Sequence, residues 1–377
     1  MGFFVRLLGA ALVLTPAPAL AQAVPVDKAS KSERFHQGVR DLHRKYQVPA
    51  VSVAVYSTKG LEAAETIGVR RVGEAAPVQL SDRFYLASVT KPFTATLGAS
   101  MVEAGLIQWS TTPADIWPAQ SKRMHPLLRR VTLAQLLSSK AGIPSFTNDS
   151  EIGTAPITPG SPREQRAAFA QWILARPPAS QIGKHVYSNA GFGVAAAMLE
   201  KVGGKSWEDL IRERVFRPLN LTSCGFGWPR TFGDQPHGHI GEGAGFVIPA
   251  GASSASLPSI IAPGGDIHCN LTDLGRFGEA HMLGTLGRHQ LLRTETFKLI
   301  HGSAEDYVLG WGNEPIGSQH LGGVTDGWQS MLYVSPSRQI VVAAATNAYQ
   351  RPATRKLLTE VTQLAFDLFS TKPAAKP

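Results

Sequence analysis

Segments with the character of β-strands lie near the two ends of this 377-residue chain, and helix-like segments lie between them. Residues 51–56 (VSVAVY) alternate in the manner of a strand, and a second strand is expected at about residues 63–69. Near the other end, residues 331–334 and 339–346 predict two more strands, and the second is too apolar to be a sheet edge. This order predicts an α+β fold in which both chain ends build one layer and a mainly helical region is inserted between them.

Helix-like patterns recur through the middle and near the far end of the chain. They are expected at residues 94–104, 131–137, 191–202, 206–215, 271–283, 294–300 and 356–369. Gly105 closes the first as a C-terminal cap, and Ser206 begins the fourth, with Asp209 completing a box-like start. Residues 226–265 are rich in Gly and Pro and poorly periodic, so long loops are expected there.

The first 21 residues have the pattern of an export signal. Arg6 supplies the positive start, residues 7–14 supply the apolar stretch, and Ala19-Leu20-Ala21 is the small-residue cleavage site. The apolar run is too short to span a bilayer, and no later segment is long and apolar enough to do so. We therefore expect a periplasmic or secreted protein without a membrane span, cleaved after Ala21.

The chain after the signal is long enough to bury a large core. We expect one domain at residues 22–371 and a flexible tail at residues 372–377. The α/β part of the domain is expected at about 27–105 and 305–371, and the helical part at about 106–304.

The chain is basic, with a formal net charge of +9. A basic balance can indicate a nucleic-acid partner, but the positive residues are scattered along the chain, at most in short pairs such as Lys122-Arg123 and Arg129-Arg130. An exported location also argues against nucleic acid. Loose association with an anionic cell envelope explains the charge more simply.

The two cysteines, Cys224 and Cys269, are a candidate disulfide pair in an oxidising compartment. The alternative is two buried thiols that behave as small hydrophobic side chains. A separate run, Asp234-x-x-His237-x-His239-x-x-Glu242, contains a His-x-His pair that suits zinc. Its glycine-rich surroundings and the lack of a matching distant ligand favour a loop that lines a cleft, so no metal is expected.

Residues 88–91 (SVTK) form the only S-x-x-K of the chain, where an extended segment turns into a helix. Three residues are most of a helical turn, so Ser88 and Lys91 project from one face and can touch. A serine hydroxyl needs a neighbour that takes its proton. A lysine amine can do so if burial or other cations lower its usual pKa of ~10.4.

Two further elements carry chemistry. In Tyr187-Ser188-Asn189, the phenol normally titrates near ~10, but beside a lysine cation it loses its proton more easily and can act as a base. In residues 320–323 (HLGG), Gly322 and Gly323 let a substrate approach the strand backbone closely and offer it an N–H.

The three elements, in this order, resemble the serine β-lactamase and D-Ala-D-Ala peptidase superfamily, and most closely its class C-like branch. The resemblance runs from about residue 35 to about residue 368. Flanking stretches at residues 131–144, 217–221, 263–265 and 307–311 support it. It implies a β-lactamase/transpeptidase-like fold with an antiparallel sheet, and an acyl-enzyme mechanism without a cofactor.

The resemblance also implies roles for single residues. Ser88 would be the nucleophile, with Lys91 and Tyr187 as its base system. Asn189 would hold Lys91 and the substrate, and Ser188 would be support. The backbone N–H groups of Ser88 and Gly323 would form the oxyanion hole. His320 would be a cation or hydrogen-bond donor at the edge of the site, titrating near ~6.5 and making activity mildly pH-sensitive.

One departure from the family pattern bears on the substrate. The middle residue of the third motif is commonly threonine or serine in penicillin-recognising members, and here it is Leu321. A small neutral ester or amide therefore becomes the leading substrate class. A D-Ala-D-Ala carboxypeptidase or D-aminopeptidase acting on a peptide and a class C-like β-lactamase are the alternatives. A non-catalytic binding or sensor protein on the same fold is the second alternative.

Structural interpretations of the same residues remain open from the sequence. Ser88 can be a helix N-cap with Lys91 in solvent, and Tyr187 can be an aromatic side chain packed beside its loop. Asn189 can cap the helix that starts near residue 191, and His320 can be a surface or structural histidine.

Overall fold

The computed structural model describes residues 29–242, 245–249, 256–324, 326–350 and 352–371. The predicted signal peptide and the predicted tail lie outside these residues. Within the described part of the chain, no helix has both the length and the apolar character needed to cross a membrane.

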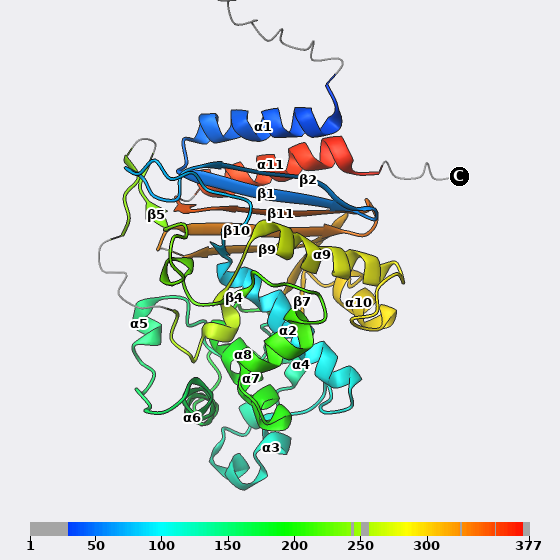
Figure 1. The fold of residues 1–377 in the computed structure, drawn as a ribbon. Helices are drawn as coiled ribbons and strands as arrows, with labels where there is room; N and C mark the ends of the chain where they lie inside the picture. The colour runs from blue at the N-terminus through cyan, green and yellow to red at the C-terminus, as the bar shows by residue number, and fades with distance from the viewer. Residues whose placement is uncertain (1–28, 243–244, 250–255, 325, 351, 372–377) are drawn as a thin grey trace, which may run out of the picture.

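A seven-stranded antiparallel sheet joins the two ends of the chain, as predicted (Figure 1). Its strands, in spatial order, are β2 (Gly60–Gly68), β1 (Ala50–Ser57), β11 (Ile340–Thr346), β10 (Trp328–Ser335), β9 (Gly317–Val324), β8 (Trp311–Glu314) and β7 (Tyr307–Val308). The ladder between β1 and β11 runs from Val51↔Thr346 to Ser57↔Ile340. It makes the N-terminal and C-terminal segments neighbours at the centre of the sheet.

Helices cover both faces of the sheet. The helices α1 (Lys31–Tyr46) and α11 (Ala353–Phe369) pack side by side on one face, and α9 (Leu271–Thr285) lies on the other (Figure 1). Every residue of β1, β10 and β11 is buried. Because both faces are covered, these strands carry mostly apolar residues on both faces, and their few polar side chains are buried as well.

The inserted region is mainly helical. It contains α2 (Thr90–Glu103), α3 (Pro113–Ile116), α4 (Leu133–Leu137), α5 (Asp149–Ile152), α6 (Pro162–Leu174), α7 (Asn189–Gly203), α8 (Trp207–Ile211), α9 and α10 (Thr294–His301). The helix expected at 206–215 begins after its Ser206 cap, but continues from Arg212 to Phe216 as a π-helix. The helices α1 and α6 were not expected from the sequence, although both begin with a capping box, Ser30 with Glu33 and Ser161 with Glu164.

Two small sheets occupy regions that the sequence left as loops. In one, β3 (Phe84–Tyr85), β6 (Ile267–Cys269) and β4 (Gly225–Phe226) pair in the order β3-β6-β4. In the other, β5 (His239–Ile240) pairs in parallel with β12 (Ala348–Tyr349). Within the described residues of 226–265 the expectation of long loops holds, since named strands contribute only Phe226 and His239–Ile240 there. Strands of two residues form only because a distant partner supplies their hydrogen bonds, so local periodicity does not reveal them.

Candidate active site

Ser88 lies in a 3₁₀ turn (Ala87–Val89, η2) between β3 and α2. Ala87 has a φ of 46°, a left-handed conformation that residues with a Cβ rarely adopt. Leu86, the residue before this turn, is fixed by two hydrogen bonds. Its N–H donates to Ile267 O (2.9 Å), and its carbonyl accepts from Ser330 Oγ (2.6 Å). Strained backbone held in this way is typical of functional sites. Ser88 makes no side-chain cap bond to α2, so the N-cap interpretation is wrong.

Lys91 is fully buried, which rules out the solvated interpretation. Its Nζ lies 2.6 Å from Asn189 Oδ1, 2.7 Å from Gly264 O and 3.2 Å from Ser88 Oγ. Burial lowers its pKa well below the usual value, because the cation loses its hydration. A neutral amine has two hydrogens and one lone pair. When the amine is neutral, the two carbonyl oxygens can accept its hydrogens, which leaves its lone pair to face the Ser88 hydroxyl.

Tyr187 reaches the same oxygen from the more exposed side. Its hydroxyl donates to Ser88 Oγ over 2.6 Å, and Lys91 Nζ lies 4.5 Å from the centre of its ring. Ser88 Oγ is therefore in contact with both groups that the sequence named as bases. A hydroxyl with a proton acceptor on one side and a phenol on the other can lose its proton when it attacks a carbonyl.

Ser188 and Asn189 have separate tasks. Ser188 is the N-cap of α7: its Oγ accepts from Gly191 N (2.9 Å) and donates to Pro144 O (2.6 Å). Asn189 is thus not the cap, contrary to one interpretation of the sequence. Its Oδ1 accepts from Lys91, and its Nδ2 donates to Phe146 O (2.9 Å). Because both ends of the amide are bonded, the oxygen is fixed toward Lys91.

Gly322 brings β9 against the catalytic turn. A Cβ at this position would lie 2.2 Å from Leu86 O and 3.1 Å from Ser88 N, so no side chain fits here. Strand β9 pairs with β8 only from Gly317 to Gln319. The later residues of β9 are therefore left to face the turn that carries Ser88. A Cβ at Gly323 would instead meet the Tyr349 ring at 2.8 Å. The pairing of the Ser88 and Gly323 amides as an oxyanion hole remains a prediction.

His320 differs from its expected state. It is 5% exposed, and its Nδ1 lies 2.6 Å from Gly310 O, so that nitrogen carries the hydrogen. Burial, followed by the charge of Lys91, lowers its pKa to about 3. The expected titration near ~6.5 is therefore wrong, and the imidazole is neutral at ordinary pH. The next residue, Leu321, packs against the hydrophobic core under α1 and α11. Neither residue presents a cation to a substrate.

Several supporting groups were missed in the sequence. Residues 263–265 were noted only as a flanking stretch, yet the Gly264 carbonyl contacts Lys91. Two residues later, Asp266 is 4% exposed, and its Oδ1 accepts from Tyr85 Oη (2.9 Å) and Leu257 N (3.0 Å). Burial raises the pKa of Asp266 to about 7. An acidic residue directly after a Pro-Gly-Gly turn was the available signal.

The His-x-His run has structural partners. His239 Nε2 accepts from Val72 N (3.0 Å), and its Nδ1 lies 2.9 Å from Asn347 O. Burial lowers the pKa of His239. In the ranges that the structure describes, no three His, Cys, Asp or Glu side chains gather in a way that could hold a metal ion.

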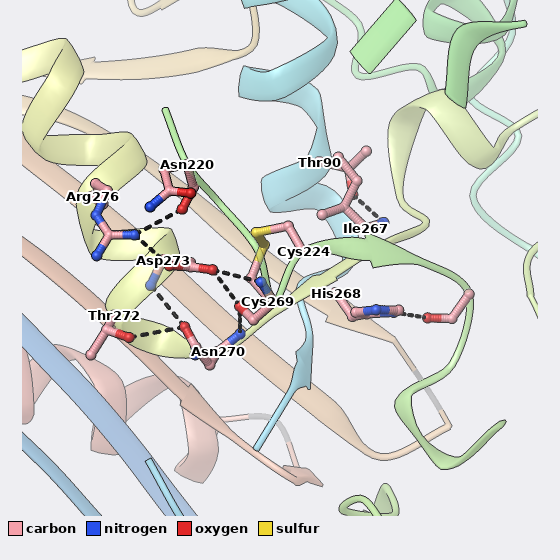
Figure 2. The surroundings of a disulfide bond; sticks show 12 residues. Thr90, Asn220, Cys224, Ile267, His268, Cys269, Asn270, Thr272, Asp273 and Arg276 are labelled. Carbon is pink, nitrogen blue, oxygen red and sulfur yellow. Dashed lines mark hydrogen bonds and ion pairs between the residues drawn. A yellow bond between two sulfur atoms is a disulfide. The ribbon is translucent and has the colours of Figure 1, made fainter. Parts of the chain in front are cut away.

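A disulfide joins Cys224 to Cys269, the last residue of β6 (Figure 2). Cys269 stands opposite Phe84 in the ladder between β6 and β3, and β3 leads directly into the turn that carries Ser88. The bond therefore ties the segment before β4 to the strand β6, which pairs with the strand that leads to Ser88.

Comparisons with known proteins bear on the family and the fold of the chain. The model of the Beta-lactamase family matches residues 35–366. Penicillin-binding protein 4 of Amycolatopsis lactamdurans is 28% identical over 355 residues, which cover 86% of each chain. Lovastatin esterase of Penicillium rubens is 26% identical over 167 residues, 41% of this chain and 42% of that protein. The octameric penicillin-binding protein homologue from Pyrococcus abyssi has a similar fold, with a TM-score of 0.68 at 20% identity over 88% of this chain and 76% of that one.

Proposed function

Since this chain belongs to the β-lactamase family of serine hydrolases, we propose that it acts through an acyl-enzyme on Ser88 and hydrolyses small neutral esters or amides. One observation carries the proposal. Ser88 Oγ lies 2.6 Å from Tyr187 Oη and 3.2 Å from the Nζ of the buried Lys91. An alcohol, a phenol and a desolvated amine in contact form the donor and acceptor set that nucleophilic attack on a carbonyl requires.

The proposed reaction has two steps. Ser88 attacks the carbonyl carbon while its proton passes to Lys91, whose own hydrogens are held by Asn189 and Gly264. Tyr187, on the more open side, passes a proton to the leaving group, and the proton taken up by Lys91 then returns to Tyr187; water next hydrolyses the acyl-enzyme along the reverse route. The amides of Ser88 and Gly323 are the proposed oxyanion donors, and the loss of one such donor typically costs ~3–4 kcal/mol of barrier.

The preference for a neutral substrate rests on the third motif. The His320 imidazole is buried and neutral, and Leu321 packs into the hydrophobic core. A carboxylate bound beside β9 would lose water without gaining a cation from either residue, which is costly. A similarity to a protein named lovastatin esterase is consistent with an uncharged acyl donor.

A second candidate is a peptidase or β-lactamase activity. It is favoured by the similarity along most of the chain to a protein named penicillin-binding protein 4. The two candidates share Ser88, Lys91, Tyr187 and Asn189, and they differ in whether the substrate carries a carboxylate near the scissile bond. A non-catalytic binding protein would share the fold but not the reactivity of Ser88.

Four reagents, two that label covalently and two chromogenic substrates, separate these functions. Purified protein is incubated with a fluorophosphonate, a fluorescent penicillin, p-nitrophenyl butyrate and nitrocefin, with Ser88→Ala as the control. We expect fluorophosphonate labelling and ester turnover that both disappear in the variant, with little penicillin labelling. Prompt nitrocefin hydrolysis would instead identify a β-lactamase. Labelling by neither covalent reagent would favour the binding protein.

We also propose that residues 1–21 are a signal peptide and that the mature enzyme is periplasmic or secreted. The support is the basic start, the short apolar stretch and the Ala-Leu-Ala site of the sequence. N-terminal sequencing of protein recovered outside the cytoplasm should begin at Gln22. An intact Met1 in that fraction would contradict the proposal.

A further inference from the structure

Cys224 lines a surface cavity of about 320 Å³ that also has two arginines in its wall. Arg217 is exposed, and Arg212 forms an ion pair with Asp209 at 3.0 Å. Phe216 and Leu221 supply apolar wall next to these charges. The cavity therefore offers positive charge, and room for a small molecule, beside one end of the disulfide.

The two sulfur positions differ in access. Cys224 is half-buried, whereas Cys269 is fully buried, so a dissolved thiol can reach only the Cys224 end of the bond. Cys269 directly precedes Asn270, the N-cap of the 15-residue helix α9. The N-terminus of a helix stabilises a thiolate, and a stabilised thiolate leaves faster in thiol–disulfide exchange. Asp273 lies in the same first turn, but its charge is paired with Arg276 at 2.8 Å.

A polar network beside the disulfide keeps the same segments together (Figure 2). Ser223 donates to Asp273 Oδ2 from its N–H (2.8 Å) and from its Oγ (2.7 Å). Asn270 N donates to Ser223 Oγ over 3.0 Å. These bonds cross the same gap as the disulfide, so the chain is expected to remain folded after the S–S bond opens.

Strand β6 connects the disulfide to the catalytic turn. Ile267 N donates to Thr90 Oγ1 over 3.0 Å, and Ile267 O accepts from Leu86 N over 2.9 Å. These two bonds reach residues on either side of Ser88. Opening the disulfide removes a covalent restraint on the strand that makes both bonds.

We propose that Cys224 is a thiol-exchange site for small anionic thiols, through which opening of the Cys224–Cys269 disulfide slows acylation of Ser88. The incoming thiolate attacks Cys224 Sγ, the S–S bond breaks, and Cys269 leaves as a thiolate that takes a proton from water. A second thiolate attacks the added sulfur and releases Cys224 as a thiol. Two electrons thus pass from two small thiols to the protein disulfide. The thiol exchange does not depend on the proposed function. The effect on acylation of Ser88 rests on that function.

The exchange is tested on oxidised full-length mature protein with three thiols at equal thiolate concentration: mercaptoethanesulfonate, 2-mercaptoethanol and cysteamine. Opening is followed by alkylation and peptide mass spectrometry. We expect the anionic thiol to react at least about threefold faster than the neutral one and the cationic one to be slowest, with the order lost near ~1 M salt. The first adduct should be on Cys224. The double variant Arg212→Gln/Arg217→Gln should abolish the order, and Arg288→Gln, at an exposed arginine beyond the other end of α9, should preserve it.

Equal rates for the three thiols, or a first adduct on Cys269, would overturn the exchange site. Fluorophosphonate labelling of Ser88 is measured on the oxidised and the opened protein, with retained circular dichroism as the folding control. We expect labelling to slow at least about threefold on opening, and an unchanged rate or lost fold would overturn the link to Ser88. If the oxidised protein is not labelled at all, the proposed function fails, while the exchange experiment is still decided by mass alone.

Discussion

The hydroxyl of Tyr187 donates to Ser88 Oγ over 2.6 Å, although 99 residues separate the two along the chain. The contact requires two distant elements to be placed together: the turn before α2 carries Ser88, and Tyr187 directly precedes Ser188, the N-cap of α7. The function of this group of side chains depends on its own residues and on the buried residues that support them.

Replacement of Lys91 should remove the proton acceptor of Ser88. For Lys91→Ala we expect fluorophosphonate labelling to slow by at least ~10²-fold, as is usual for the loss of a general base. Lys201→Ala is the matched control, because Lys201 is exposed on α7. Labelling of Lys91→Ala at the parental rate would remove this amine from the mechanism.

Two tyrosines whose rings lie 6.4 Å apart should behave in opposite ways. Tyr187→Phe keeps the ring but removes the hydroxyl that contacts Ser88, so we expect kcat for p-nitrophenyl butyrate to fall by ~10²–10⁴-fold. Tyr307→Phe removes a buried hydroxyl that has no partner among the described residues. It should leave kcat near the parental value and keep or raise Tm. Equal losses in the two variants would indicate a packing role for Tyr187.

The activity profile should be independent of His320 ionisation. Because burial lowers its pKa to about 3, the imidazole stays neutral between about pH 5 and 8. A His320→Gln variant, which keeps a hydrogen-bond donor for Gly310 O, should show the same shape of kcat/KM against pH as the parent. A limb near pH ~6.5 that disappears in the variant would show that the imidazole titrates in the free enzyme.

Asp266 should make stability fall as pH rises. Its folded pKa is raised from 3.8 to about 7, so the folded state retains a proton that the unfolded state releases. The free energy of unfolding should therefore decrease from about pH 4 to about pH 7, by up to about 4 kcal/mol, and level off above that. In urea unfolding at several pH values, Asp266→Asn should lose this part of the slope. Asp209→Asn, at an exposed position, should keep it.

If the free energy of unfolding falls equally steeply with pH in the parent and in Asp266→Asn, the raised pKa assigned to Asp266 is contradicted. Other buried carboxyls also contribute: burial raises the pKa of Glu200 and of Glu279. The comparison between the two asparagine variants isolates the contribution of Asp266, because Glu200 and Glu279 are unchanged in both.

The central strands and the ordered motifs were predictable, because the signals for them are local. An apolar run such as residues 340–346 indicates a buried strand wherever its partners come from, and Ser88 with Lys91 indicates a shared helical face. The short strands β3, β4 and β6 were not predictable. Two or three residues carry no period, and the partner strand lies far along the chain: Phe84 of β3 pairs with Cys269 of β6, and Gly225 of β4 pairs with His268 of β6.

The sequence by itself determined which residue types are available, in which order, and that the two chain ends share a sheet. Only the tertiary structure decided their chemical states. The amine of Lys91 loses its charge readily because Asn189, Gly264 and the surrounding core exclude water from it. His320 is neutral because it is buried beside Gly310 rather than placed in solvent. Desolvation depends on segments that are distant along the chain, so no local motif specifies it.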